Sequence, residues 1–320
     1  MMPALEVVAP GPHTTVQDLG RRGFQDVGVP ASGPLDRVSL RLANALVGNP
    51  AGTPALEMLL QGPTLKVLAD SVRVALVGCT AGIEVRSHKV RRIAAGRSVR
   101  LLRDEVLRIG ALGDSVCAYL AIEGGPDVPQ VLGSASTYVR GAIGGVHGRR
   151  LRERDSVPLK LPGVDERSER MLSRPVDLAL DQPIRVVLGP QSDYFAPDAV
   201  KTFLSSVYTV SPQADRMGYR LEGPALAHVK GYDIISDGIV TGSVQVPGSG
   251  RPIVLMVDHQ TTGGYPKIAT VISTDIPVVG RRKPGRAIRF AAIDVREAER
   301  LRKEQEAAVR REMADIHDVD

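Results

Sequence analysis

The chain has 320 residues, of which 43% are hydrophobic and 3% are aromatic, with no tryptophan. A single hydrophobic core stops growing at about 250 to 300 residues, so we expect two domains. The 41 Lys and Arg against 36 Asp and Glu give a formal net charge of +5. This mixed surface lacks the stacking aromatics of a nucleic-acid-binding protein, so we expect no nucleic acid as a partner.

Short apolar runs of strand length recur along the chain, and most are bounded by Gly, Pro or Asp. They lie at residues 5–10, 64–69, 72–78, 117–125, 184–190, 251–258, 268–273 and 287–293. This spacing, with 33 Gly and 23 Pro, is typical of a mainly β protein with tight turns.

Three helices are expected among these strands. Residues 34–50 form an amphipathic pattern in which Val38, Leu42 and Leu46 share a face, and Gly48 with Pro50 ends it. A second helix is expected within residues 192–204. Residues 295–316 are rich in Ala, Glu and Arg at helical spacing and predict the longest helix.

Neither a targeting segment nor a metal site is expected. The N-terminus has no charged leader before an apolar run, and no stretch reaches about 18 apolar residues, so we expect a cytoplasmic protein without membrane contact. Cys79 and Cys117 lie in apolar runs and are expected to pack as small hydrophobic side chains, although a disulfide between them stays open. The six histidines are scattered, which argues against a metal.

The two halves of the chain resemble each other. The sequence VVAPGPHTT near the start matches VVLGPQSDY at residues 186–194, and a later pairing places Glu123 and Asp258 at the ends of equivalent strands. The polar, proline-bounded segment between the halves is the expected linker. We therefore expect a first domain at 1–162 with an inserted polar loop at 14–36, a linker at 163–183, a second domain at 184–293 and a C-terminal helix at 294–320.

After the polar segment at residues 14–23, the strongest candidate site follows the apolar run at residues 253–257. A rigid strand that ends in polar side chains and paired glycines presents a site, because glycine lets backbone N–H groups face an anion. The alternative is a solvated turn. Asp258 is a candidate general base, and Gln245 is a candidate for hydrogen bonding to an amide group of the substrate. The other candidates in this turn are Gln260, Thr261, Thr262, Gly263 and Gly264.

Polar clusters elsewhere supply further candidates. Arg216 and Arg220 lie beside Asp215 and Gly218, a combination suited to clamping a carboxylate or phosphate. The inserted loop contributes Gln17, Asp18, Arg21, Ser32 and Asp36, and Asp36 is also a candidate helix cap. A third segment offers Ser134, Ser136, Thr137 and Tyr138.

Several catalytic motifs are missing. The sequence has no P-loop, no dinucleotide fingerprint, no H-E-x-x-H, no C-x-x-C and no G-x-S-x-G elbow. A nucleotide would therefore have to be held by other means.

Five ordered segments carry a resemblance to a known family. They are TVQDLGRRGFQDVGVPASGPLD, LANALVGNPAGTPALE, VLGSASTYVRGAIGG, DRMGYRLEG and GSVQVPGSGRPIVLMVDHQTTGGYPKIA. They are similar to the carboxyltransferase-related family of allophanate hydrolase subunit 2, which includes the C subunit of 5-oxoprolinase. The resemblance runs from about residue 5 to residue 293 and implies two tandem cyclophilin-like β-barrel domains.

The resemblance implies three functions. The first is the C subunit of an ATP-dependent 5-oxoprolinase, which acts with the A and B subunits and shares ATP with its partner. The second is a carboxyltransferase component of a biotin-dependent urea or amide carboxylase, with biotin carried on another chain. The third is a regulatory module that antagonises a kinase inhibitor related to the B subunit.

The first function assigns provisional roles to the candidate residues. Asp18, Arg21 and Asp258 are the predicted catalytic residues, and the other candidates are predicted substrate or phosphate contacts. We expect the inserted loop at residues 14–36, here called the opening loop, to face the turn after Asp258. We also expect Arg21→Ala to impair activity with little change in melting temperature. The chain departs from the family pattern at Arg281, where a Gln is usual, and at His259, where Arg is common.

Overall fold

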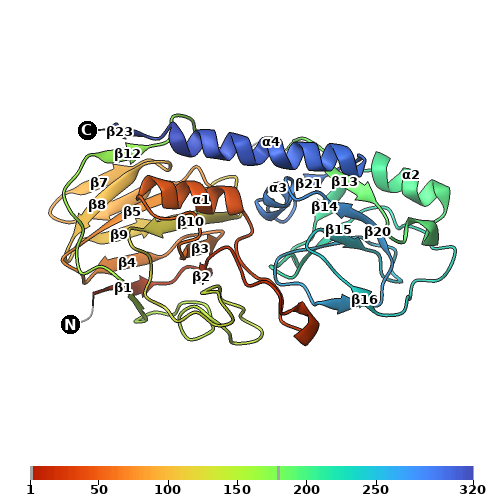
Figure 1. The fold of residues 1–320 in the computed structure, drawn as a ribbon, viewed down its shortest axis with the longest axis horizontal. Helices are drawn as coiled ribbons and strands as arrows, with labels where there is room; N and C mark the ends of the chain where they lie inside the picture. Colours follow the sequence, from red (N-terminus) through yellow and green to blue (C-terminus); the bar gives the residue numbers. More distant parts are fainter. Residues whose placement is uncertain (1–2, 179–180, 320) are drawn as a thin grey trace. The chain divides into compact units, whose positions relative to one another are not determined.

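The computed structural model describes residues 3–178 and 181–319 (Figure 1). Residues 1, 2, 179, 180 and 320, which fall in the expected first domain, linker and C-terminal segment, lie outside the described residues. The chain is mainly β with few helices, as predicted. Contacts divide it into unit 1, which is residues 1–21, 32–178 and 308–320, and unit 2, which is residues 22–31 and 179–307.

Unit 1 is built from two sheets around one apolar core. In sheet order, the six-stranded sheet is β11 (Ser156–Pro158), β1 (Ala4–Ala9), β4 (Thr64–Val67), β9 (Val106–Ile109), β6 (Ile83–Arg86) and β7 (Val90–Ile93). The five-stranded sheet is β2 (His13–Gln17), β3 (Ala55–Leu59), β10 (Cys117–Ile122), β5 (Ser71–Val77) and β8 (Ser98–Leu102). Alternate side chains of both sheets, such as Leu5, Val7, Leu56 and Met58, are fully buried in this core.

Unit 2 contains an eight-stranded sheet that nearly closes into a barrel. In sheet order its strands are β21 (Ala287–Ile288), β14 (Tyr208–Val210), β15 (Gly218–Glu222), β18 (Ile253–Leu255), β17 (Ser243–Gln245), β20 (Lys267–Val271), β13 (Ile184–Leu188) and β22 (Phe290–Ala292). The two edge strands, β21 and β22, are separated by Arg289 alone, so one stretch of chain occupies both edges. Phe203 stacks on Phe290 with ring centroids 4.5 Å apart and anchors the core.

The predicted helices are present. Helix α1 (Arg37–Leu46) begins at its N-cap Asp36, and the second prediction corresponds to η2 (Ser192–Tyr194) followed by α2 (Pro197–Ser205). The third prediction corresponds to α4 (Val295–Ala314). The described residues also form η1 (Gln25–Val27) and α3 (Ile276–Gly280), which the sequence pattern did not predict. None of the described helices is long and apolar enough to span a membrane.

Glu123 and Asp258 each follow a central strand of a sheet, and the strands around them are arranged in the same order in the two sheets. In unit 1 the later strand β10 lies between β3 and β5, and in unit 2 the later strand β18 lies between β15 and β17. All four pairings are antiparallel. Glu123 follows β10 directly, and Asp258 follows β18 after two residues.

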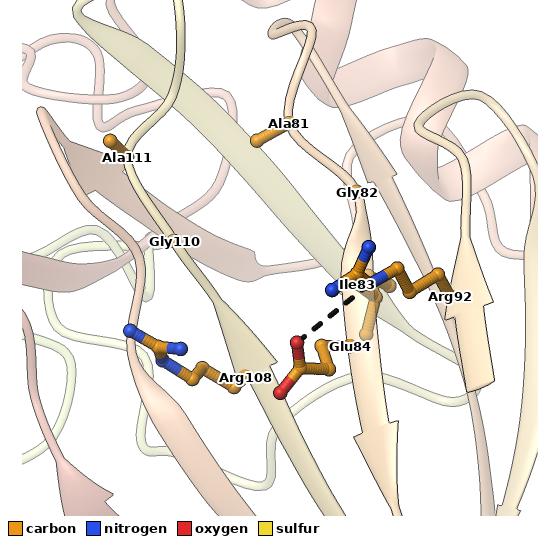
Figure 2. Close-up of a pocket in the computed structure, with 8 residues that line it drawn as sticks. All are labelled: Ala81, Gly82, Ile83, Glu84, Arg92, Arg108, Gly110 and Ala111. Atoms are coloured by element: carbon orange, nitrogen blue, oxygen red, sulfur yellow. Dashed lines mark ion pairs between the residues drawn. The ribbon is translucent and has the colours of Figure 1, made fainter. Parts of the chain in front are cut away.

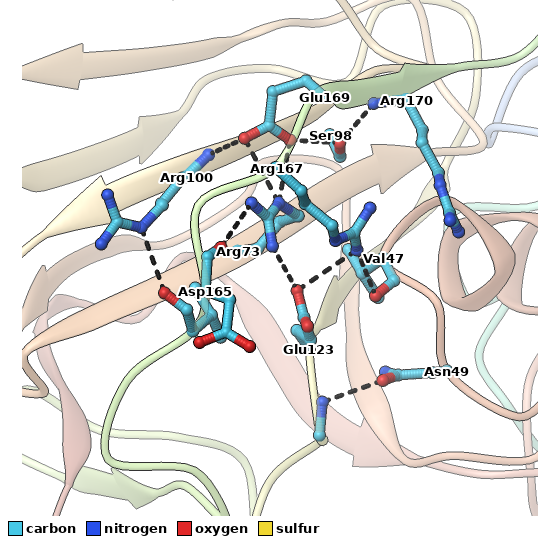
Figure 3. A network of polar contacts seen from close by, with 12 residues as sticks. Val47, Asn49, Arg73, Ser98, Arg100, Glu123, Asp165, Arg167, Glu169 and Arg170 are labelled. Carbon is cyan, nitrogen blue, oxygen red and sulfur yellow. Dashed lines mark hydrogen bonds and ion pairs between the residues drawn. The ribbon is translucent and has the colours of Figure 1, made fainter. Parts of the chain in front are cut away.

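The first part of the expected linker packs against unit 1 through a buried arginine (Figure 3). The Arg73 side chain is fully buried and donates to Glu123 at 2.6 Å and to Glu169 at 3.1 Å. Arg167 donates to Glu123 at 3.3 Å and to the Val47 carbonyl at 3.0 Å. Strand β12 (Glu169–Met171) then pairs with β23 (His317–Val319). The segment is therefore held by paired charges and by a strand, and Glu123 has a structural role.

Candidate functional site

Asp18 organises the first cluster of predicted residues, which lies in unit 1. Its carboxylate accepts hydrogen bonds from the hydroxyls of Ser134 at 2.5 Å and Ser136 at 2.6 Å. It also accepts from the backbone N–H of Ala135 at 2.6 Å and of Gly20 at 2.9 Å. With its oxygens engaged in this way and 6% of its surface exposed, Asp18 fixes the Ser134–Ser136 turn against the opening loop.

Arg21 and Gln17 extend this cluster. Arg21 is 2% exposed and donates to the backbone carbonyls of Ser136 and Val131. Gln17 is fully buried and donates to the Thr137 carbonyl at 3.1 Å. Its Oε1 has no hydrogen-bond partner within residues 3–178 and 181–319. Since buried polar atoms are normally paired, this oxygen is an acceptor available to a ligand or water.

Ser32 and Asp36 lie on the segment that leads into α1. Ser32 has a φ of 53°, and its buried hydroxyl lacks a partner among the described residues. Such strain in a non-glycine residue is concentrated at functional positions. Asp36 is fully buried and accepts from the backbone N–H groups of Val38 and Ser39. The cap expected for Asp36 is therefore confirmed.

Sequence reasoning missed two buried residues beside Asp36. The Tyr119 hydroxyl donates to Glu57 at 2.6 Å and accepts from the Asp36 N–H at 2.8 Å. Burial, followed by the neighbouring Glu57 carboxylate, raises the pKa of Tyr119 well above its ordinary value. Both residues stand opposite each other on β10 and β3, and Thr15 of β2 stands opposite Glu57. The sequence signal that could have found this pair was one polar side chain within each of two otherwise apolar strands, and the structure shows that the two side chains face each other.

Asp258 belongs to the second cluster, which lies in unit 2. Its carboxylate accepts from Arg216 Nε at 2.8 Å and from Nη2 at 3.1 Å. The two side chains are 7% and 4% exposed, so they form a buried bidentate ion pair. This geometry joins the segment that leads into β15 to the turn after β18. Arg220, by contrast, is exposed between buried Tyr219 and Leu221 on β15, and the structure does not bring it to this pair.

The turn after Asp258 presents the other predicted residues. Gln260 and Thr262 are exposed, and Thr261, Gly263 and Gly264 are half-buried. Gln260 Nε2 lies 3.4 Å from Oε1 of Gln245, which is 2% exposed. Strand β19 (Thr262–Gly263) pairs with β16 (Asp237–Gly238). The turn therefore combines accessible hydroxyls and amides with a fixed backbone.

Sequence reasoning also missed an ion pair at this turn. Lys267 is buried on β20, and its ammonium donates to Asp237 at 2.8 Å. This hydrogen bond and the Lys267 charge lower the pKa of Asp237. Lys267 stands opposite Gln245 in the sheet. In the sequence, Lys267 follows the paired glycines after one tyrosine and one proline. This closeness to the predicted turn was the sequence signal that could have identified it.

The two departures from the family pattern are both buried. His259 is 4% exposed, and its Nδ1 lies 2.5 Å from the Gln260 carbonyl. Burial lowers the pKa of His259 below its ordinary value of 6.5. Arg281, at the C-terminal end of α3, is 5% exposed. Neither side chain lies free at the surface as a solvated cation.

A pocket of about 310 Å³ in unit 1 contains none of the predicted residues (Figure 2). Glu84 of β6 stands opposite Arg92 of β7 and Arg108 of β9. It contacts Arg92 at 3.9 Å and Arg86 at 2.7 Å. These facing charges offset one another, as expected for a cross-strand row at a sheet surface.

The part of the chain that the structure describes contains no group of three or more His, Cys, Asp or Glu side chains that could hold a metal ion. Its two clusters offer hydroxyls, amides, backbone groups and cations instead. Such donors suit an anionic or amide-bearing ligand.

Comparison with known proteins identifies the family. The chain is 37% identical to the C subunit of 5-oxoprolinase from Escherichia coli (strain K12) over 302 residues, which cover 94% of this chain and 95% of that protein. It is 33% identical to urea amidolyase of Saccharomyces cerevisiae over 336 residues, which cover 96% of this chain but 18% of that protein. The solved urea amidolyase of K. lactis superposes with a TM-score of 0.88 at 30% identity, over 98% of this chain and 20% of that chain. Residues 27–292 match the carboxyltransferase domain, subdomain A and B, and the chain therefore belongs to this carboxyltransferase domain family.

Proposed function

We propose that the chain is the C subunit of an ATP-dependent 5-oxoprolinase, which opens the lactam of 5-oxoproline to glutamate together with the A and B subunits. The observation that carries this proposal is the nearly end-to-end match to the C subunit of a known 5-oxoprolinase, at 37% identity over 95% of that protein. We place the complex in the cytoplasm, where ATP is available.

The proposed reaction explains why the site needs anion and amide contacts. A lactam is a poor electrophile, so its oxygen first attacks the γ-phosphate of ATP and releases ADP. Water then adds to the activated carbon and the C–N bond breaks, which leaves the amine of glutamate and a γ-glutamyl phosphate. A second water hydrolyses this acyl phosphate to glutamate and inorganic phosphate. Charge grows on oxygen in each step, so fixed donors stabilise the transition states.

The contacts within each unit divide the predicted residues into two roles. Asp18, Arg21, Asp258 and Arg216 are buried and bonded within the protein, and we propose that they position the loops around them. Substrate or phosphate contacts are then proposed for Gln17 and Ser32, which have unpartnered polar atoms among the described residues, and for Gln260, Thr261, Thr262, Gly263 and Gly264 of the turn. A further contact is proposed for Gln245, which is buried beside Gln260. Arg220 stays a predicted anion contact, and ATP is shared with the partner.

Reconstitution tests this function. The chain is co-expressed with homologues of the A and B subunits, and glutamate release from 5-oxoproline is measured with and without ATP. We expect release that requires ATP and this chain. Release that persists when the chain is omitted would contradict its role, and the absence of release from the full set would contradict the function.

Carboxyl transfer is the second candidate, because the family is named for it and urea amidolyase matches 96% of this chain. In this case biotin would arrive on another protein. The same preparation, supplied with carboxylated biotin carrier protein and urea, would transfer labelled carboxylate to urea. A regulatory module would show neither activity but would still bind the homologue of the B subunit.

We also propose that the two units descend from one cyclophilin-like barrel. The shared order of β3, β10 and β5 with β15, β18 and β17 supports this proposal. The paired acids Glu123 and Asp258 then occupy equivalent positions, each bonded to a buried arginine.

A further inference from the structure

Lys267 is a buried cation whose hydrogen bonds are incomplete. Its side chain is 3% exposed, and Asp237 is the one partner of its ammonium among residues 3–178 and 181–319. An ammonium carries three N–H donors. Since a buried charge is stable only when it is paired and hydrogen-bonded, the remaining donors suit a ligand with anionic oxygens.

Asp237 covers this cation from the solvent side. Its side chain is 51% exposed, whereas that of Lys267 is 3% exposed. It lies on the short strand β16, which forms a two-stranded sheet with the two-residue strand β19. The one other side chain that donates to its carboxylate within the described ranges is Gln191, at 3.4 Å. The carboxylate also accepts from the Gly238 N–H at 2.7 Å, and it is held on a short, exposed element.

Amide groups lie beside the same cation. Gln245 faces Lys267 across β17 and β20, and its Nε2 lies 3.5 Å from the Tyr265 carbonyl. Gln260 Nε2 lies 3.4 Å from Gln245 Oε1. These contacts are long for hydrogen bonds, so both amides are available to shift toward a ligand. A Cβ on Gly263 would lie 2.7 Å from Gln245 Nε2, which shows that the backbone of the turn passes directly against this amide.

We propose that Lys267 binds the carboxylate of the substrate, and that Asp237 occupies this position until the substrate carboxylate replaces it. The neighbouring Gln245 and Gln260 then form hydrogen bonds with the amide of the same small molecule. The ligand class is a small lactam or amide that also carries a carboxylate. This inference rests on the proposed function, because 5-oxoproline has both groups within one small molecule.

Equilibrium binding to the full chain tests the subsite. 5-Oxoproline is compared with 2-pyrrolidinone, which has the same lactam but no carboxylate. Lys267→Met should weaken 5-oxoproline binding by about tenfold to a hundredfold, the range expected for a hydrogen bond to a charged group, and should leave 2-pyrrolidinone binding unchanged. Lys201→Met, on an exposed position of α2, is the matched control. Equal binding of 5-oxoproline by wild type and Lys267→Met, or no binding to wild type, overturns the proposal.

A second variant does not depend on the folding of Lys267→Met. Asp237→Asn keeps the buried cation and removes the competing charge, so 5-oxoproline should bind more tightly than to wild type. Asp233→Asn, an exposed neighbour, should bind as wild type does. Weaker binding by Asp237→Asn would overturn the exchange of carboxylates.

Turnover by the complex with the A and B subunits separates this inference from the proposed function. Carboxylate-dependent binding through Lys267 without any glutamate release would reject the function and retain the subsite. Glutamate release by Lys267→Met with an unchanged KM would retain the function and reject the subsite. We expect release with a KM raised in Lys267→Met and lowered in Asp237→Asn.

Discussion

At the scale of single residues, burial separates the predicted groups by role. Asp258 is a candidate general base in the sequence, yet its carboxylate is bonded at 2.8 Å to a buried guanidinium. Removing one partner of such a pair costs about 3–5 kcal/mol, because the other charge is left uncompensated. Loss of activity in a variant of Asp258 therefore has to be separated from loss of folding.

Arg21 is the clearest case in which the structure revises an expectation. The sequence alone predicts that Arg21→Ala leaves the melting temperature nearly unchanged. The side chain is 2% exposed and donates to two backbone carbonyls, so its loss leaves buried acceptors unsatisfied. We now expect the free energy of unfolding to fall by about 1–3 kcal/mol in urea denaturation. Arg22→Ala, at the exposed adjacent position, should change it little, and equal stability of the two variants would contradict this role.

His259 predicts a pH dependence of stability. Burial lowers its pKa below 6.5 in the folded chain, so the unfolded chain takes up a proton at a pH where the folded chain resists it. The contribution of neutral His259 to the stability of the folded chain is complete above pH 6.5 and is lost as the pH falls through the lowered pKa. Wild type should therefore lose more free energy of unfolding than His259→Gln between about pH 7.5 and about pH 5.5.

The control for this pH prediction is His88→Gln, at an exposed position. The free energy of unfolding of this variant should change with pH as that of wild type does across the same range. If His259→Gln also follows wild type, burial of the imidazole does not govern the acid dependence.

At the scale of elements, local patterns located most strands and helices because their signals are short-range. The helix expected within residues 34–50 is α1, and the helix expected at residues 295–316 is α4 (Val295–Ala314). The polar opening loop is different. Its first part is fixed by Ser134 and Ser136, more than a hundred residues away in the chain, and no local pattern specifies those partners.

The N-cap of α1 gives a prediction for this element. Asp36 accepts from Val38 N–H at 2.9 Å and from Ser39 N–H at 3.1 Å. Asp36→Ala should lower the free energy of unfolding by about 1–2 kcal/mol, whereas Asp36→Asn should retain most of it, because Asn caps as well as Asp. Chemical denaturation measures both. An equal loss in the two variants would show that the charge of Asp36 matters more than its cap.

At the scale of the whole molecule, the chain has two apolar cores, each within one unit. Leu56 and Phe203 are both 0% exposed, the first in the core of unit 1 and the second in the core of unit 2. Chains with more than one domain commonly depart from two-state unfolding. We therefore expect each unit to have its own stability.

Hydrogen exchange measured by mass spectrometry tests this division. Leu56→Ala should speed exchange in peptides of unit 1, and Phe203→Ala in peptides of unit 2, each by a local destabilisation of about 2–5 kcal/mol. Equal acceleration of both units by either variant would show that the chain unfolds as one cooperative unit.

The sequence by itself determined the β class, the principal helices, the family and the segments that carry the polar clusters. These follow from periodicity, turn residues and long ordered motifs, all of which are local along the chain. The tertiary structure decided which polar groups are already bonded and which are available. Asp18 and Asp258 found buried partners, while Lys267 and Asp237, overlooked in the sequence, proved to be an ion pair between strands of two sheets. Burial and pairing depend on contacts between distant residues, so no single stretch of sequence specifies them.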